Sequence, residues 1–210
     1  FINSLAEKIN NDPRIDNKIK VVFIENYDVS KAELIIPAAD VSEQISTTTK
    51  EASGTGNMKL MMNGAITLAT LDGANIEIFD QVGEDNIVIF GLSANEVLNY
   101  NKFGGYSALD LYNSNRVIKR VVDDLVNGFI PNMEKEGRQI YDSLITYNDE
   151  YFVLRDMENY IEAQEKIDRL YKDKEKWNEM ALINIANSGV FSSDRTIAEY
   201  AEDIWFKGCE

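Results

Sequence analysis

The densest set of groups that could do chemistry lies at residues 51–59, which read Glu-Ala-Ser-Gly-Thr-Gly-Asn-Met-Lys. Two glycines and two hydroxyls precede an apolar, helix-like stretch that begins with a single lysine, Lys59. Unpaired backbone N–H groups at a helix start carry partial positive charge and bind phosphate. Gly54 and Gly56 would let a ligand approach the backbone closely, and Thr55 would add a hydroxyl. The segment therefore predicts a phosphate-binding loop with a primary amine beside it.

Lys59 is expected in the first helical turn, where the helix dipole opposes a positive charge. Met58, Leu60, Met61 and Met62 flank it, and burial among them would disfavour the ammonium form further. A partly neutral lysine is what imine formation with an aldehyde requires. A ligand that carries both a phosphate and an aldehyde points to pyridoxal phosphate. The alternative is an ordinary turn followed by a lysine that extends from an amphipathic helix into solvent.

A nucleotide-binding P-loop is the other function that a glycine-rich loop before a helix suggests. Its pattern is Gly, four residues, then Gly-Lys followed by Ser or Thr. Here Met58 precedes Lys59 and Leu60 follows it, so the hydroxyl that holds magnesium is missing. We therefore reject the nucleotide interpretation.

Composition excludes several other classes. The chain has 210 residues, 44% hydrophobic and 27% charged, which is typical of a soluble globular protein with one large domain or two small ones. Its net charge of −15 argues against nucleic acid and anionic membranes as partners. No apolar run approaches the roughly 20 residues that span a bilayer. We expect a cytoplasmic protein.

Metal and imidazole chemistry is also excluded by residue type. The chain contains no histidine, and Cys209 is its single cysteine. The usual zinc sites, histidine-based triads and an internal disulfide framework are therefore ruled out, and we expect no metal. The carboxylate pairs at 84–85 and 123–124 are interpreted as solvated surface groups of an acidic protein.

Strand-like and helix-like stretches alternate up to about residue 92. The segments that read as strands are 20–24, 41–46, 66–70, 75–79 and 87–90, and the turn signal Asp72-Gly73 separates the third from the fourth. Those that read as helices are 1–11, 29–39 and 55–63, the last ending at Asn63-Gly64. This alternation predicts an α/β fold with a mostly parallel sheet and helices on its faces.

Only helices are expected after residue 92. Apolar stripes occupy residues 117–125, 160–170 and 177–185, and Ser192 to Asp194 cap a last helix. The inner face of that helix is expected to comprise Ile197, Tyr200, Ala201, Ile204 and Trp205. We favour a core role for Trp177, Tyr200 and Trp205 over a role as surfaces on which a sugar ring stacks, because their helical spacing already explains them. We therefore expect an α/β portion at 1–92 and a helical portion at 93–210 packed on it.

Residues 51–77, EASGTGNMKLMMNGAITLATLDGANIE, closely resemble the pyridoxal-phosphate attachment segment of the α-glucan (glycogen, starch and maltodextrin) phosphorylases. Four further segments also resemble motifs of this family: ENY at 25–27, IPAAD at 36–40, SEQIS at 42–46 and SSDRTI at 192–197. These motifs are collinear and extend over essentially the whole chain. The resemblance implies a Rossmann-like sheet from the C-terminal domain of a GT-B glycosyltransferase fold, with further strands upstream and an uncovered sheet edge.

The resemblance also implies residue roles. Lys59 matches the lysine that forms the Schiff base with pyridoxal 5'-phosphate. The cofactor-binding set that it implies is Lys59, Thr55, Gly56 and Tyr27, with the amides of Thr55 and Gly56 on the phosphate. The set implied to hydrogen-bond the transferred glucosyl unit is Glu51, Ser53 and Gly54. In this family the cofactor phosphate exchanges a proton with the substrate phosphate, which in turn protonates the glycosidic oxygen.

The implied parent enzyme is a homodimeric, allosteric phosphorylase that converts α-1,4-glucan and phosphate to glucose 1-phosphate. The basic residues that hold substrate phosphate and most of the glucan site would precede Phe1, so we expect this chain alone to be inactive. A hypothesis of another class is a non-catalytic folding or interaction module without cofactor. The preferred glucan is left open.

The chain departs from the family pattern at two places. The family usually reads Ser-Thr-Ala-Gly where this chain has Ser-Thr-Thr-Thr at 46–49. Thr49 is β-branched and does not easily adopt the positive φ that glycine allows. Ala69 stands where glycine is common.

Overall fold

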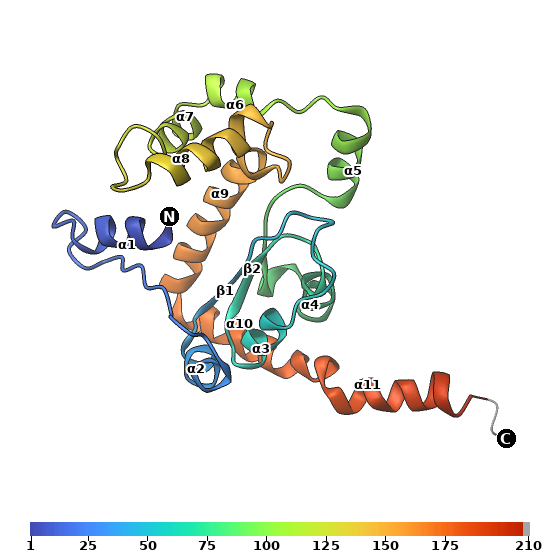
Figure 1. The fold of residues 1–210 in the computed structure, drawn as a ribbon. Helices are drawn as coiled ribbons and strands as arrows, with labels where there is room; N and C mark the ends of the chain where they lie inside the picture. The colour runs from blue at the N-terminus through green and yellow to red at the C-terminus, as the bar shows by residue number, and fades with distance from the viewer. Residues whose placement is uncertain (208–210) are drawn as a thin grey trace. The chain divides into compact units, whose positions relative to one another are not determined.

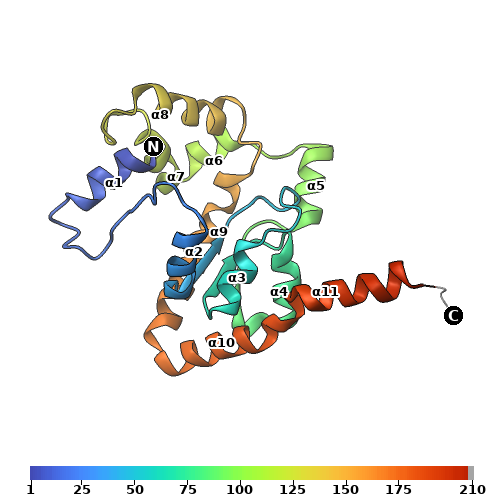
Figure 2. The ribbon, with the colours of Figure 1, turned by 60° about the horizontal axis from the view of Figure 1, so that its bottom comes forward.

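The computed structural model describes residues 1–207, so Cys209 lies outside the described part of the chain. Contacts group the residues into two compact units (Figures 1 and 2). Unit 1 comprises Phe1–Val29 and Leu98–Glu158, and unit 2 comprises Ser30–Val97 and the residues from Asn159 onward. The division into residues 1–92 and 93–210 stays a prediction.

Unit 2 contains a three-stranded parallel sheet in the order β1-β2-β3. Its strands are β1 (Val41–Gln44), β2 (Ile66–Ala69) and β3 (Val88–Ile89). Val41 lies opposite Ile66, and Leu68 lies opposite Val88. All four residues of β2 are buried, as expected of a central parallel strand covered on both faces. The predicted parallel α/β arrangement is confirmed.

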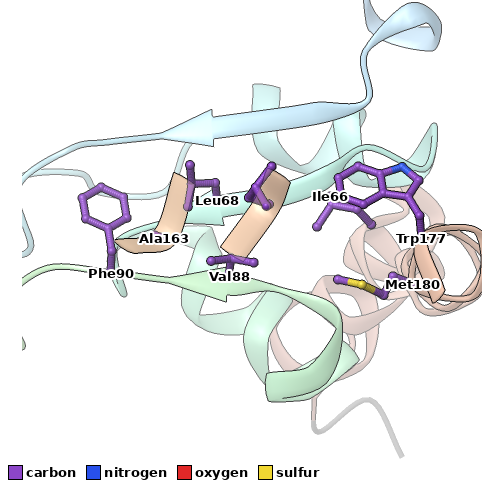
Figure 3. Packing of buried hydrophobic residues seen from close by; sticks show 8 residues of the cluster. Ile66, Leu68, Val88, Phe90, Ala163, Trp177 and Met180 are labelled. Atoms are coloured by element: carbon purple, nitrogen blue, oxygen red, sulfur yellow. The ribbon is translucent and has the colours of Figure 1, made fainter. Parts of the chain in front are cut away.

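Helices cover both faces of this sheet. On one face, Met61 of α3 (Gly56–Met62) and Ile78 and Val82 of α4 (Ala74–Val82) pack with Ile87. The other face packs on α9 (Val153–Lys172) and α10 (Lys174–Asn187). The cluster there, shown in Figure 3, comprises Ile66, Leu68, Val88, Phe90, Ala163, Ile167, Trp177 and Met180. Each fully buried large side chain of this kind contributes about 1.5–3 kcal/mol.

The remaining elements of unit 2 are short. They are α2 (Val29–Ile35), η1 (Ile36–Ala38), η2 (Glu84–Asn86), η4 (Ser188–Phe191), α11 (Ser193–Tyr200) and the π-helical η5 (Ala201–Trp205). Two helix starts follow their sequence signals. The Asp173 side chain accepts the Lys176 N–H of α10, and the Ser192 hydroxyl accepts the Arg195 N–H of α11.

Unit 1 is helical in its regular structure. It contains α1 (Ile2–Asn10), α6 (Ala108–Ser114), α7 (Arg116–Asp123), α8 (Glu134–Tyr141) and the π-helical η3 (Asp142–Thr146). Helices α5 (Ala94–Phe103) and α9 contribute residues to both units, and Val29, the first residue of α2, also belongs to unit 1. The predicted stripe at 117–125 is confirmed in part, since Ile118 and Val122 are buried with Ala108 and Leu154, whereas Val117 and Val121 are exposed.

The predicted strand at Lys20–Ile24 is wrong. The segment has no regular structure, and Phe23 is 55% exposed. The backbone of Val21 exchanges hydrogen bonds of 2.8 and 2.9 Å with the Asn10 side-chain amide instead of with a neighbouring strand. A continuous apolar run predicts burial, but it does not supply the ladder partner and covering helices that a buried strand needs.

The predicted extended segment at Asn75–Phe79 is also wrong, because these residues lie in α4. Ala74, Ile78 and Val82 are four residues apart and all buried, which is helical periodicity. The Asp72-Gly73 pair therefore precedes a helix rather than joining two strands.

The last helix forms where predicted, but its apolar face is not a core. Ile197, Tyr200, Ile204 and Trp205 are exposed, Trp205 by 56%, whereas Trp177 is buried as predicted. An amphipathic pattern shows which face prefers burial without showing what covers it.

Residues 1–207 contain neither a membrane-spanning helix nor a cluster of metal-binding side chains. No helix there combines the length and apolar character needed to cross a bilayer. Nor do three or more His, Cys, Asp or Glu side chains meet there in a way that could hold a metal ion.

Candidate functional site

The loop of residues 46–55, named here the Gly-rich loop, connects β1 to α3 at the carboxyl edge of the parallel sheet. Hydroxyls tie it to the segments that follow the other two strands. Thr70 donates to the Ser46 carbonyl at 2.6 Å, and the buried Thr48 donates to the Leu92 carbonyl at 2.8 Å. Ligands of open α/β sheets bind at this edge, so the loop lies where a ligand-binding site is expected.

Asp72 holds the middle of the Gly-rich loop. Its Oδ2 accepts the N–H of Lys50 at 3.0 Å and the N–H of Glu51 at 2.7 Å. The side chain is buried, with 7% exposure, so water competes little for these bonds. Hydrogen bonds to a charged acceptor contribute about 1.5–3 kcal/mol each. Glu51 is therefore fixed at its backbone while its side chain stays exposed.

Gly73 brings the loop against the start of α4. The Ala74 N–H donates to the Ser53 carbonyl at 2.7 Å. Gly73 has φ +52° and ψ −142°, and a Cβ there would lie 2.4 Å from the Ser53 carbonyl oxygen. Only glycine fits such a close backbone approach. We name the contacts of Asp72, Gly73 and Ala74 with the loop the clamp.

Two buried asparagines join α3 to α4. The Asn57 side-chain amide donates to the Asn75 Oδ1 at 2.8 Å, and the Asn75 amide donates to the Thr70 carbonyl at 3.2 Å. The Asn57 Oδ1 accepts the Met58 N–H at 2.9 Å. The start of α3 is therefore fixed by side chains from the same segment that forms the clamp.

Thr49 has φ +81°, the left-handed conformation that its β-branched side chain disfavours. The loop thus has a glycine-like backbone at the position where the resemblance to the family predicts a glycine. A threonine held in this region stores strain of about 1–3 kcal/mol.

Lys59 lies one turn into α3, and its N–H donates to the Thr55 carbonyl at 3.3 Å. Both side chains are exposed, and the Thr55 side chain makes no capping hydrogen bond. A Cβ on Gly56 would meet no other atom within 4 Å, so the space beside this backbone is open. A free amine, a free hydroxyl and an open backbone thus adjoin one another, a donor set that suits a ligand with a carbonyl and a phosphate.

The apolar surround expected for Lys59 is absent. Met61 is fully buried in the core, Met58 and Leu60 are partly buried, and Lys59 is exposed. Residues one or two apart on a helix point to different faces, so flanking methionines do not enclose the lysine between them.

The other predicted site residues are distributed as follows. Ser53 is exposed and Gly54 is partly buried with φ +91°, both in the Gly-rich loop with Glu51. The structure thus brings Glu51, Ser53 and Gly54 onto one clamped segment. Tyr27 belongs to unit 1 and is 60% exposed, and its place near a cofactor stays a prediction.

Sequence reasoning missed the positioning residues of the clamp. Asp72 and Gly73 were interpreted as a turn, and Asn75 as part of a strand. The available signal was the Asp-Gly pair directly before a helical repeat of apolar residues at 74, 78 and 82.

Comparison with known proteins gives a consistent result. The family model for carbohydrate phosphorylases matches residues 1–207. The glycogen phosphorylase of Bacillus subtilis is 58% identical over 205 residues, which is 98% of this chain and 26% of that protein. The liver form of human glycogen phosphorylase is 48% identical over 98% of this chain, and the Synechocystis glycogen phosphorylase is 49% identical over the same share. The chain spans about a quarter of the length of these relatives.

Proposed function

This chain belongs to the carbohydrate phosphorylase family, and we propose that it is the pyridoxal-phosphate-bearing C-terminal portion of an α-1,4-glucan phosphorylase. The proposed reaction of the complete enzyme is reversible transfer of a glucosyl unit from the non-reducing end of the glucan to phosphate, giving glucose 1-phosphate. The observation that carries the proposal is the 58% identity with a glycogen phosphorylase over 98% of the chain.

In this proposal the cofactor is held by residues of α3 and its start. The Lys59 amine would attach it, and the backbone N–H groups of Thr55 and Gly56 would hold its phosphate. When bound, pyridoxal phosphate would supply a phosphate group that passes a proton to the substrate phosphate. The exposed amine and the open space beside Gly56 support this assignment, because a ligand reaches both without displacing a side chain.

The Gly-rich loop would bind the glucosyl unit. Glu51, Ser53 and Gly54 would hydrogen-bond its hydroxyls, and Asp72 would keep the backbone of Glu51 in place through two hydrogen bonds. A loop fixed before the substrate arrives loses less conformational entropy on binding, which favours both affinity and orientation.

We further assign the parallel sheet of unit 2 to the C-terminal domain of a GT-B fold and expect a cytoplasmic, homodimeric enzyme. The position of the loop at the carboxyl edge of the sheet supports the first assignment. Because the chain spans about a quarter of its relatives, we expect the 210 residues alone to lack phosphorolysis activity.

The cofactor assignment is tested by borohydride reduction of the complete enzyme in the presence of pyridoxal phosphate, followed by peptide mapping. We expect the label on Lys59, its loss in Lys59→Arg and its retention in Lys102→Arg, which changes a lysine on α5. A label spread evenly over surface lysines contradicts the assignment.

A second candidate function is a non-catalytic interaction module. The exposed apolar side chains of Phe23 and of α11 favour it, because such surfaces commonly contact other proteins. If the isolated 210-residue chain takes no label while the complete enzyme does, this candidate describes the chain and the first describes its parent.

A further inference from the structure

Unit 1 contains a small pocket whose wall is aromatic. The pocket encloses about 260 Å³ and lies between the end of α5 and the segment that connects η3 to α9. The Phe152 ring stacks on Tyr100, with centroids 5.6 Å apart and planes at 28°, and contacts the Tyr106 ring at 5.0 Å. Phe152 is buried, whereas Tyr100 and Tyr106 are partly exposed towards the pocket.

Hydrogen bonds hold the polar side of this pocket rigid. Asp149 is 2% exposed, and its Oδ2 accepts the Tyr106 hydroxyl and the Leu154 N–H, each at 2.7 Å. Burial, and then the bond to Asp149, raise the pKa of the Tyr106 phenol, which therefore remains a neutral donor. Asn148 accepts the Ala108 N–H at 2.8 Å. The shape of the pocket is thus set before any ligand arrives.

The rim of the pocket offers groups that the fold itself does not use. Tyr147 is 75% exposed, and Asn101 is exposed as well. Tyr147 is thus an exposed aromatic side chain in the lining of the pocket, where a bound ring could reach it.

The charge of the lining selects the chemistry of the ligand. Asp149 and Glu150 are its two charged residues, and neither Lys nor Arg is among the described residues that line it. A phosphate or carboxylate ligand is disfavoured there by like charge. A neutral, hydroxyl-rich ring is favoured, because its hydroxyls pair with carboxylate and amide groups while its C–H faces pack on aromatic rings.

We propose that this pocket binds one glucosyl unit of an α-glucan chain, with Tyr147 as the stacking platform and Asn101 and Glu150 as hydroxyl partners. The volume lies just under the roughly 300 Å³ at the low end of pockets for drug-sized ligands, which suits a single sugar ring. The choice of glucan rests on the proposed function, but the site itself does not involve Lys59 or the Gly-rich loop.

The test is the migration of the 210-residue chain in native gels that contain glycogen. We expect glycogen to retard the chain and Tyr147→Ala to weaken the apparent affinity about tenfold, through loss of one aromatic contact. Phe103→Ala is the matched control, because Phe103 is an aromatic residue of α5 that is 73% exposed, much like Tyr147, and does not line the pocket. It should migrate like the unchanged chain.

Further arms separate this site from the proposed catalytic one. Glycogen should retard the Glu51→Ala and Lys59→Ala variants as strongly as the unchanged chain. Addition of inorganic phosphate should not reduce this retardation. The proposal is overturned if glycogen does not retard the unchanged chain, if Tyr147→Ala and Phe103→Ala behave alike, or if Glu51→Ala abolishes the effect. The borohydride experiment can fail independently of each of these outcomes, so the two proposals are tested separately.

Discussion

Gly73→Ala tests whether the clamp fixes the Gly-rich loop. The added Cβ would lie 2.4 Å from the Ser53 carbonyl oxygen and 3.0 Å from its carbon, both backbone atoms. The φ of +52° with ψ −142° is open essentially to glycine alone, so alanine adds about 1–3 kcal/mol of strain. Relief of the clash separates Ser53 from Ala74 and loses a 2.7 Å hydrogen bond, about 1 kcal/mol. The expected cost is on the order of 2–4 kcal/mol.

The assay is urea unfolding combined with amide hydrogen exchange. For a slope of about 2–3 kcal/mol per molar urea, a loss of about 3 kcal/mol lowers the midpoint of unit 2 by about 1 M. The N–H groups of Lys50 and Glu51 should exchange faster as the loop is released, because the clamp protects them.

Gly189→Ala is the matched control for Gly73→Ala. A Cβ at Gly189 would meet nothing within 4 Å, and its φ is not positive, so the unfolding free energy should change by less than about 0.5 kcal/mol. Equal urea midpoints for Gly73→Ala and the unchanged chain would refute the clamp. A decrease of the midpoint in Gly189→Ala as large as that in Gly73→Ala would refute it as well.

Three further predictions concern the same chain. Asp72→Ala removes the acceptor of the N–H groups of residues 50–51, so we expect a loss of about 2–4 kcal/mol in unfolding free energy and faster hydrogen exchange of both amides. Unchanged exchange would contradict the role of Asp72 in holding the loop. Thr49→Gly relieves a positive φ and should stabilise the chain by about 1 kcal/mol in urea unfolding, whereas a lower midpoint would show that the threonine is not strained. The side-chain hydrogen bond from Arg14 lowers the pKa of Asp12 from 3.8 to about 2, so the pair is stabilising above about pH 4 and is lost as the pH falls through about 2. Carboxyl NMR titration should show that midpoint and its return towards 3.8 in Arg14→Gln.

Local patterns were sufficient for much of the fold. The runs at 66–70 and 87–90 form the central and third strands, and Asn63-Gly64 ends α3, where Gly64 has φ +86°. Caps, periodicity and glycine stops act within a few residues, so they can be read directly from the chain.

Two of the failures share one physical cause. Lys20–Ile24 has the composition of a buried strand but no neighbouring strand, and α11 has an apolar face that the described residues leave exposed. Burial depends on residues far away in the chain, and a local pattern contains no information about whether those residues are in place.

The sequence by itself determined the family, the three segments that form the parallel strands, and the presence of an amine, hydroxyls and glycines in one short segment. Only the tertiary structure showed that Lys59 is exposed rather than enclosed by methionines, and that Asp72 and Gly73 hold the loop from 20 or so residues away. The reason is that hydrogen bonds such as those of Asp72, and close approaches such as that of Gly73 to Ser53, join segments brought together by burial of β2 and α4, and no spacing along the chain specifies them.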